Sequence, residues 1–540
     1  MARFLTLMIA SSLSVPPSVP PLHAEVVSPW VADRGDGTYR NPVLHADYSD
    51  PDAIRVGDDF WMTASSFGHV PGLPILHSRD LVNWTLVNHA LPALVPAAHF
   101  ARPRHGEGVW APALRHHAGR FWIFYPDPDF GLYVITADDP RGHWSEPRLL
   151  LAGRGLIDPC PLWDNDGRAW LIHGWAKSRS GINNRLTLHE MSPDGTGVLD
   201  EGRVVIDADQ LPGWRTLEGP KLYKHDGWYY VFAPAGGVAE GYQAVFRSRT
   251  ILGPYENRIV LAQGGTRVNG PHQGAWVNTP GGQDWFFHFQ EMPAHGRVVH
   301  LQPMRWRSDG WPVMGDDADG DGTGEPVLAH AKPDLPWQPA REPATSDGFG
   351  GGQPGLQWQW QGNPGPDWIL PSGPSGGLRL KAVPPPGAGS LWLAPNLLMQ
   401  KFPAPSFAAE VTVALPDGGE GVSAGLVVFG YDYGWVGLRR GPEGRTELVQ
   451  ALCAGAQKDG VERVAAAVDW SEGGAVRLRV EVGAELGCRF FYRAASGDAA
   501  FRPLGESFTA SSSRWVGAKV GVFCLGADGE ADFANFVVTP

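Results

Sequence analysis

Residues 221–233 read KLYKHDGWYYVFA: a short strand-like run, a turn that contains glycine, and a second run rich in aromatic residues. This order predicts two antiparallel strands joined by a tight turn. Four other stretches repeat it, namely AIRVGDDFWMTAS (53–65), ALRHHAGRFWIFY (113–125), PLWDNDGRAWLIHG (161–174) and WVNTPGGQDWFFHF (276–289). The chain therefore carries five copies of one hairpin unit.

The spacing of these units favours one of two β architectures. They recur roughly every 50 to 60 residues, a length that fits the four-stranded blade of a propeller. Several are followed by a third strand and a Trp or Tyr, as in GLYVITADDPRGHW (131–144). Five such hairpins also fit a sandwich, but regular spacing favours radial repetition. We predict an all-β chain with a five-bladed β-propeller over residues 35–330.

The composition changes after the polar, glycine-rich run GDDADGDGTGEP (315–326). From there on, strands with a period of two follow one another at short intervals and no helical segment is apparent. Examples are FAAEVTVAL (407–415) and AVRLRVEVG (475–483). This pattern predicts a β-sandwich over residues 345–540.

Bulk properties narrow the partners and the compartment. A formal net charge of −13 argues against nucleic acid and anionic membranes as partners and fits a neutral substrate. Residues 1–24 resemble a signal peptide, with Arg3, the apolar run FLTLMIASSL and a cut after Ala24, so we expect a secreted or periplasmic protein. No later run is long and apolar enough to span a bilayer. The oligomeric state stays open.

The cysteines are too few for a disulfide framework. One pair among Cys453, Cys488 and Cys524 fits the sequence. No CxxC or HExxH pattern indicates a zinc site.

Three acids occupy matching positions in three of the repeats. Asp50 in SDPDAI, Asp158 in GLIDPCPLW and Glu218 in TLEGPKLY each stand at the start of the inner strand of a unit. The innermost strands of a propeller line its axis, so these acids should converge at one mouth of the tunnel. Each acid alone also fits a turn cap beside proline, but three at matching positions favour a site.

Carboxyl groups that face a neutral polar substrate point to cleavage of a glycosidic bond. One carboxyl must give its proton to the leaving oxygen, while another stays ionised and activates water. A third acid nearby would raise the pKa of the proton donor by repulsion between like charges.

The motifs NPVLHADYSDPDAIRVGDDFWM, VWAPAL, IDPCPLW, LEGPKLY and GPHQGAWV together resemble those of family 43 glycoside hydrolases. The likeness covers residues 40 to about 315 and implies a five-bladed propeller and inversion at the anomeric carbon. It implies Asp50 as general base, Glu218 as general acid and Asp158 as the residue that tunes the acid. Inversion would place the base and acid carboxyls about 6.5 to 9.5 Å apart. The sandwich is similar to the concanavalin-like, jelly-roll C-terminal domain of the β-xylosidases in this family.

Four more residues are candidates for the sugar site. His272 in GPHQG matches the axial histidine of the family, which implies a water molecule or a Ca²⁺ ion in the tunnel; a hydrogen-bonded core histidine fits equally. Arg297 resembles the arginine that holds sugar hydroxyls, and a surface ion pair is its alternative. Trp110 and Phe67 are predicted to contact the apolar faces of the sugar. No cofactor is expected beyond that calcium.

The run from Asp316 to Glu325 partly resembles a calcium loop, with alternating Asp317, Asp319 and Asp321. Leu328 stands where an EF-hand loop needs glutamate, so a solvated turn between the domains is favoured.

The predicted function is exo-acting release of xylose, arabinose or both from xylan or arabinoxylan oligosaccharides. The alternatives are an α-L-arabinofuranosidase that debranches arabinoxylan or arabinan, and a propeller that binds carbohydrate without catalysis. A retaining, fructan-type hydrolase is disfavoured, since a WMNDPNG-like start is absent. The sandwich either binds sugar or braces the active site, and we favour the brace.

Overall fold

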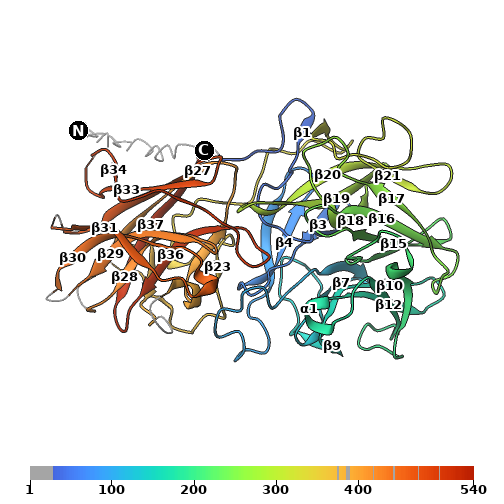
Figure 1. The fold of residues 1–540 in the computed structure, drawn as a ribbon, viewed down its shortest axis with the longest axis horizontal. Helices are drawn as coiled ribbons and strands as arrows, with labels where there is room; N and C mark the ends of the chain where they lie inside the picture. Colours follow the sequence, from blue (N-terminus) through green and yellow to red (C-terminus); the bar gives the residue numbers. More distant parts are fainter. Residues whose placement is uncertain are drawn as a thin grey trace, which may run out of the picture.

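The computed structural model describes residues 28–540, apart from 374–375, 385–389, 417–418, 442–443, 472 and 498. The predicted signal peptide, residues 1–24, lies outside the described residues. Figure 1 shows two β-rich parts side by side along the long axis, one with the strands from β1 (Thr38–Arg40) to β21 (Pro312–Met314) and the other with those from β23 (Gln359–Trp360) to β37 (Glu530–Thr539).

Five four-stranded sheets follow one another along the chain, and within each the strands pair antiparallel in chain order. The first holds β2 (Asp52–Val56), β3 (Asp59–Thr63), β4 (Gly72–Ser78) and β5 (Thr85–Leu91); the second β6 (Ala113–His117), β7 (Arg120–Asp127), β8 (Gly131–Ala137) and β9 (Arg148–Ala152); the third β10 (Leu156–Trp163), β11 (Ala169–Trp175), β12 (Arg185–Met191) and β13 (Arg203–Asp207); the fourth β14 (Lys221–His225), β15 (Trp228–Ala235), β16 (Tyr242–Ser248) and β17 (Glu256–Leu261); the fifth β18 (His272–Asn278), β19 (Asp284–Met292), β20 (Gly296–Trp306) and β21 (Pro312–Met314).

The aromatic second strands of the repeats form the cores between neighbouring sheets. Phe121 and Ile123 of β7 pack with Trp61 of the first sheet. Phe60 of β3 packs with Phe287 of β19, so the first and fifth sheets share a core. The inner strands β2, β6, β10 and β14 contact one another in turn, and β18 contacts β2. The fourth and fifth sheets meet through β15 and β18, so the ring is closed and the five-bladed propeller prediction is confirmed.

Two antiparallel sheets make up the C-terminal part. One has the order β23 (Gln359–Trp360), β26 (Leu398–Lys401), β36 (Lys519–Leu525), β28 (Ser423–Phe429), β29 (Tyr433–Arg440), β30 (Thr446–Cys453) and β31 (Arg463–Asp469). The other has the order β24 (Ile369–Leu370), β25 (Leu378–Lys381), β37 (Glu530–Thr539), β27 (Phe407–Ala414), β32 (Val476–Val482), β33 (Gly487–Ala494) and β34 (Arg502–Pro503), with β35 (Phe508–Thr509) also on β33. Alternate residues of both sheets, such as Leu426 and Val411, meet in one core, which confirms the β-sandwich.

Short elements complete the described fold. They are β1 (Thr38–Arg40) paired with β22 (Ala329–Ala331), α1 (Lys177–Ser180), and 3-10 turns at Ala208–Gln210, Gly350–Gly352, Leu391–Leu393 and Ala456–Lys458. Within the described residues, no helix has the length and apolarity needed to cross a membrane.

The suggested disulfide is wrong, because all four cysteines are free and buried. Cys488 lies in β33 of one sheet of the sandwich. Cys453 in β30 and Cys524 in β36 belong to the other sheet, where β28 and β29 stand between them.

The propeller and the sandwich meet through buried polar contacts. The Asp47 carboxylate accepts hydrogen bonds from the backbone N–H of Arg297 in the propeller and of Gly517 in the sandwich, both at 2.9 Å. The rings of His105 and Trp392 stack with centroids 3.5 Å apart. The Ala294 N–H donates to Ser512 Oγ at 3.0 Å, and the Ala294 carbonyl accepts from the Ala518 N–H at 2.6 Å, so the sandwich loop 511–518 is held against the end of the propeller that carries Arg297.

Candidate active site

Three aspartates lie within residues 47–52, around the start of β2, and they have three different surroundings. Asp47 joins the two domains, whereas Asp50 lines a cavity. Asp52 is fully buried in the tunnel, where it accepts from the Leu114 N–H and from Arg115 Nη1, each at 2.7 Å. Lys221 Nζ lies 3.7 Å from the same carboxylate oxygen. Of the three acids, Asp50 is the one that faces open space.

A cavity of about 270 Å³ lies at the mouth of the propeller nearest the sandwich. Its wall consists of Asp50, Phe67, Trp110, Ala111, Ile157, Asp158, Thr216, Glu218, Gly237, Val238, Gln273, Arg297 and Trp515. Six of the seven residues predicted from the sequence are therefore together in one wall. The seventh, His272, stands behind Glu218. We call this space the acid cavity.

Asp50 is surrounded by hydrogen-bond donors. Ser49 and Ser65 donate their hydroxyls to Oδ2 at 2.7 and 2.6 Å, and Arg297 Nη1 lies 3.0 Å from Oδ1. Asp50 is 5% exposed and adopts a left-handed φ of 54°, which Asp tolerates better than most residues. Only donors meet this carboxyl group, so the arrangement suits a carboxylate that accepts.

Asp158 leaves the regular ladder of β10 at a bulge, because the pairing with β11 shifts between Ile157 and Cys160. The bulge and a φ of 56° turn its carboxyl into the acid cavity. Asp158 Oδ2 accepts the backbone N–H of Gly219 at 2.7 Å. A Cβ atom at Gly219 would lie 2.8 Å from the Gln273 side chain, and the φ of Gly219 is 60°, in the left-handed region. Both features favour glycine beside Glu218.

Asp158 and Glu218 influence each other electrostatically. Burial, and next the negative charge of Glu218, raise the pKa of Asp158. Two interacting carboxyls titrate as a pair. One of the two protons of this pair is therefore released with a pKa well above the usual range of a carboxyl group. The Glu218 side chain is 25% exposed while Asp158 is 4% exposed, so Glu218 is the more accessible of the two.

His272 contacts the Glu218 carboxyl group from the interior of the propeller. Its Nε2 lies 3.0 Å from Glu218 Oε1, and the ring is fully buried. His272 Nδ1 has no protein hydrogen-bond partner among the described residues. Calcium binds oxygen atoms, so this nitrogen would reach such an ion only through water, and the tunnel calcium stays a prediction.

Arg297 touches both Asp50 and the acid cavity. Its side chain is 8% exposed, and its Nε has no hydrogen-bond partner in the part of the chain that the structure describes. The guanidinium therefore braces Asp50 through Nη1, while its buried Nε lies 3.7 Å from Glu291 Oε1. The predicted surface ion pair does not apply to a buried side chain of this kind.

Aromatic rings form one side of the acid cavity. Trp110 meets Phe67 and Trp515 edge to face, with ring centroids 6.2 and 6.1 Å apart. Trp515 comes from the sandwich, and sequence reasoning missed it because its segment SSSRWVGAKV carries no motif. Ser49, beside Asp50, could have been noticed from its position; Ser65 and Gln273 gave no such signal.

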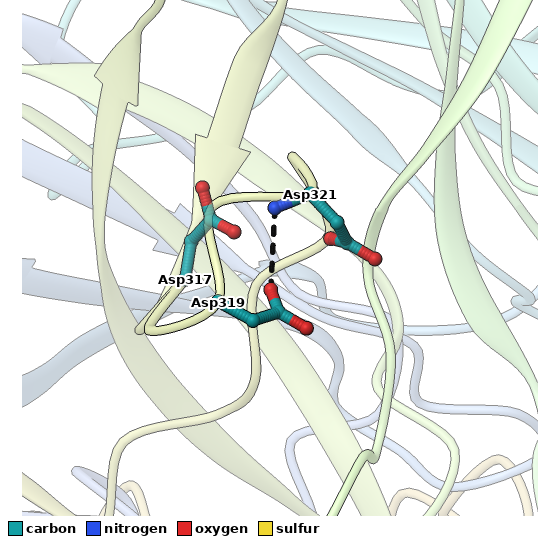
Figure 2. Close-up of side chains that lie close together, drawn as sticks. All are labelled: Asp317, Asp319 and Asp321. Atoms are coloured by element: carbon teal, nitrogen blue, oxygen red, sulfur yellow. Dashed lines mark hydrogen bonds between the residues drawn. The ribbon is translucent and has the colours of Figure 1, made fainter.

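The loop of Asp317, Asp319 and Asp321 lies apart from the acid cavity, and Figure 2 shows its three side chains together. One oxygen from each comes within 4.8 Å of the others. Arg305 Nη2 lies 2.9 Å from Asp317 Oδ2, and Asp319 accepts the Asp321 N–H at 3.2 Å. Both interpretations of this loop, turn and calcium site, stay predictions.

Comparison with known families gives two matches. A model described as Glycosyl hydrolases family 43 matches residues 39–312. A second, described as Beta xylosidase C-terminal Concanavalin A-like domain, matches residues 346–539.

Individual relatives are similar over most of the chain. A putative beta-xylosidase of Xylanibacter ruminicola is 39% identical over 95% of this chain and 90% of its own length. A non-reducing end alpha-L-arabinofuranosidase of Bacteroides ovatus is 31% identical over 66% of this chain and 67% of its own. The crystal structure of a xylan beta-1,4-xylosidase from Bacillus halodurans superposes with a TM-score of 0.80 and 26% identity, over 93% of this chain and all of that one.

Proposed function

Because the chain belongs to the glycosyl hydrolases of family 43 and is thus an inverting glycoside hydrolase, we propose that it is an exo-acting β-xylosidase. The substrate would be a xylan or arabinoxylan oligosaccharide, and the product would be xylose. The observation that carries this proposal is the joint placement of Asp50, Asp158 and Glu218 in one cavity.

Asp50 acts as general base. Its donors leave it as a carboxylate that can take a proton from water as the water attacks the anomeric carbon. Arg297 and the two serine hydroxyls fix the direction of this carboxyl.

Glu218 acts as general acid and protonates the leaving oxygen. Burial, and next the negative charge of Glu218, raise the pKa of Asp158, so the two interacting carboxyls retain a proton that Glu218 would deliver. His272 holds the orientation of Glu218. Asp158 is a positioning and tuning residue, because its carboxyl binds the backbone next to the acid.

The size and walls of the cavity support exo action. At about 270 Å³ it lies just below the range of about 300–1,000 Å³ found for drug-sized ligands, so it admits few sugar rings. Trp515 closes one side, where an open groove would otherwise let a polymer pass. Trp110 and Phe67 offer rings to the apolar face of the sugar.

A panel of nitrophenyl β-D-xyloside and α-L-arabinofuranoside, with arabinoxylan and linear arabinan, tests the proposal. We expect xylose release from the xyloside and from xylo-oligosaccharides, with inversion seen by NMR of the first product. Failure to release any pentose would contradict the proposal.

The relative from Bacteroides ovatus supports a second candidate, an α-L-arabinofuranosidase. Faster release of arabinose than of xylose across the panel would favour it.

A further inference from the structure

The propeller has a second cavity, of about 320 Å³, at the other end of its axis. The catalytic candidates lie at the beginnings of inner strands, since Asp50 precedes β2 and Glu218 precedes β14. The second cavity is lined by later residues of all five inner strands, β2, β6, β10, β14 and β18. We call it the distal cavity. No role for it follows from the proposed hydrolysis.

Two indole rings in the wall of the distal cavity are held in place. Trp163 stacks on His117 with centroids 4.3 Å apart and planes at 6°, and its Nε1 donates to the Pro193 carbonyl. Trp276 Nε1 donates to Asp284 Oδ1 at 2.7 Å, and its ring meets Tyr223 edge to face. Both N–H groups are satisfied, so the rings offer fixed apolar faces of the kind that sugar C–H groups contact.

The distal cavity also contains one positive charge without a carboxylate partner. Arg115 pairs with Asp52, and Lys224 pairs with Asp164. Arg55 donates from Nε and Nη1 to the carbonyls of Asn278 and Gly57, at 2.8 and 2.9 Å. Among the described residues, no carboxylate lies within 4.0 Å of its guanidinium. The whole chain has a net charge of −13, yet this half-buried arginine gives the cavity a positive charge.

The cation and one of the rings are neighbours. Trp276 and Asn278 stand two residues apart in β18 and so face the same side of the strand. Arg55 bonds to Asn278 across the gap between β2 and β18, which places its guanidinium on the side where the Trp276 ring lies. An apolar ring face and an uncompensated guanidinium thus meet in one cavity.

We propose that the distal cavity binds a sugar unit that carries a carboxylate, as in the uronic acid branch of an acidic polysaccharide. The sugar ring contacts Trp276 and the carboxylate binds Arg55 through charge-assisted hydrogen bonds. A neutral sugar would make only the contact with the Trp276 ring. An inorganic anion would make only the electrostatic interaction with Arg55.

Titration calorimetry on the full chain tests this site. The Glu218→Gln variant prevents turnover, and the probes are glucuronate-substituted xylotetraose, plain xylotetraose and inorganic phosphate. We expect the acidic probe to occupy a site that the other two do not. Adding Arg55→Gln should weaken that binding by about tenfold or more, while Arg55→Lys should restore part of it.

Arg120→Gln is the matched control, since Arg120 is an exposed arginine of β7 that lies outside the cavity and pairs with Asp138, the residue after β8. Equal affinity of the acidic probe for the Arg55→Gln and Arg120→Gln proteins would overturn the proposal. So would equal binding of plain xylotetraose or of phosphate at this site. If Arg55→Gln does not fold, Trp276→Leu replaces it: the acidic probe should then lose affinity because the aromatic face is gone, and unchanged affinity would overturn the proposal.

The binding readout needs no hydrolysis, so the two proposals fail separately. In the background with Glu218 intact, Arg55→Gln should hydrolyse nitrophenyl xyloside as Arg120→Gln does. Absence of hydrolysis in every variant would count against the proposed function alone.

Discussion

Asp47→Asn tests whether one buried carboxylate sets the junction between propeller and sandwich. Asp47 is 4% exposed and accepts one backbone N–H from each domain, at Arg297 and Gly517. Asparagine has nearly the same shape but only one acceptor oxygen. In either orientation, one of the two amides would therefore face an NH₂ group.

The expected loss follows from these contacts. A buried donor that loses its acceptor costs about 1–3 kcal/mol. Lys519 is also buried beside the junction; burial and then the charge of Lys401 lower its pKa to about 7, and Asp47 acts in the opposite direction. Removal of the negative charge from Asp47 therefore destabilises the junction further. We expect a loss of about 2 kcal/mol, which for a domain of this size lowers Tm by about 4–8 °C.

Scanning calorimetry of the full chain at pH 7 measures this change. Asp138→Asn is the control, because Asp138 is 81% exposed on the propeller. KM for an aryl xyloside should rise more than kcat falls, since Gly517 is two residues from Trp515 in the cavity wall. A Tm within about 1 °C of that of Asp138→Asn would show that the two hydrogen bonds do not hold the domains.

Four other outcomes follow. Glu218→Gln should slow hydrolysis of xylobiose by about 10²–10⁴-fold and that of an aryl xyloside with a good leaving group much less; equal losses in initial rate would exclude the acid role. The pKa of Asp158 is raised to about 8, so activity should fall as the pH rises through that region. Asp158→Asn removes the repulsion between the Asp158 and Glu218 charges and should move the alkaline limb of the kcat/KM profile to lower pH. An unmoved alkaline limb would contradict the coupling of the two carboxyls. Trp515→Ala should raise KM by about tenfold, since a buried aromatic contributes about 1.5–3 kcal/mol; steady-state kinetics showing an unchanged KM would remove Trp515 from the sugar site. Mass spectrometry of the exported protein should give a chain that starts after Ala24, and an intact Met1 would refute the signal peptide.

The repeats made the fold predictable from the sequence. Each hairpin unit carries its own turn and its own aromatic strand, so local pattern and overall architecture agree. The same reasoning located Asp50, Asp158 and Glu218, because residues at equivalent positions of a radial repeat must meet near the axis. Their catalytic roles, in contrast, came from the family resemblance and stay proposals.

Contacts between distant segments were not predictable. Trp515 reaches the acid cavity on a sandwich loop that Asp47 and Ala294 hold in place, and the hairpin repeats do not mark these contacts. Arg297 was predicted to bind sugar hydroxyls, but its Nη1 donates to Asp50 and to Ser49 Oγ. This contact likewise depends on packing that the sequence does not reveal. The predicted cysteine pair was wrong for the same reason. The period-two pattern of a strand does not show which strands are neighbours in a sheet, so it cannot show which cysteines are close together.

The position of Trp515 means that two separate stretches of the chain, the propeller and the sandwich, both contribute to the wall of the acid cavity. A gene cut after the propeller would encode all three acids and still lack one ring of the cavity wall. Exchange of the C-terminal segment between relatives would change that side of the cavity, while Arg297, Trp110 and Phe67 would stay with the N-terminal segment. In such chimaeras, the stereochemistry of hydrolysis should follow the N-terminal segment, and KM should change with the residue that replaces Trp515.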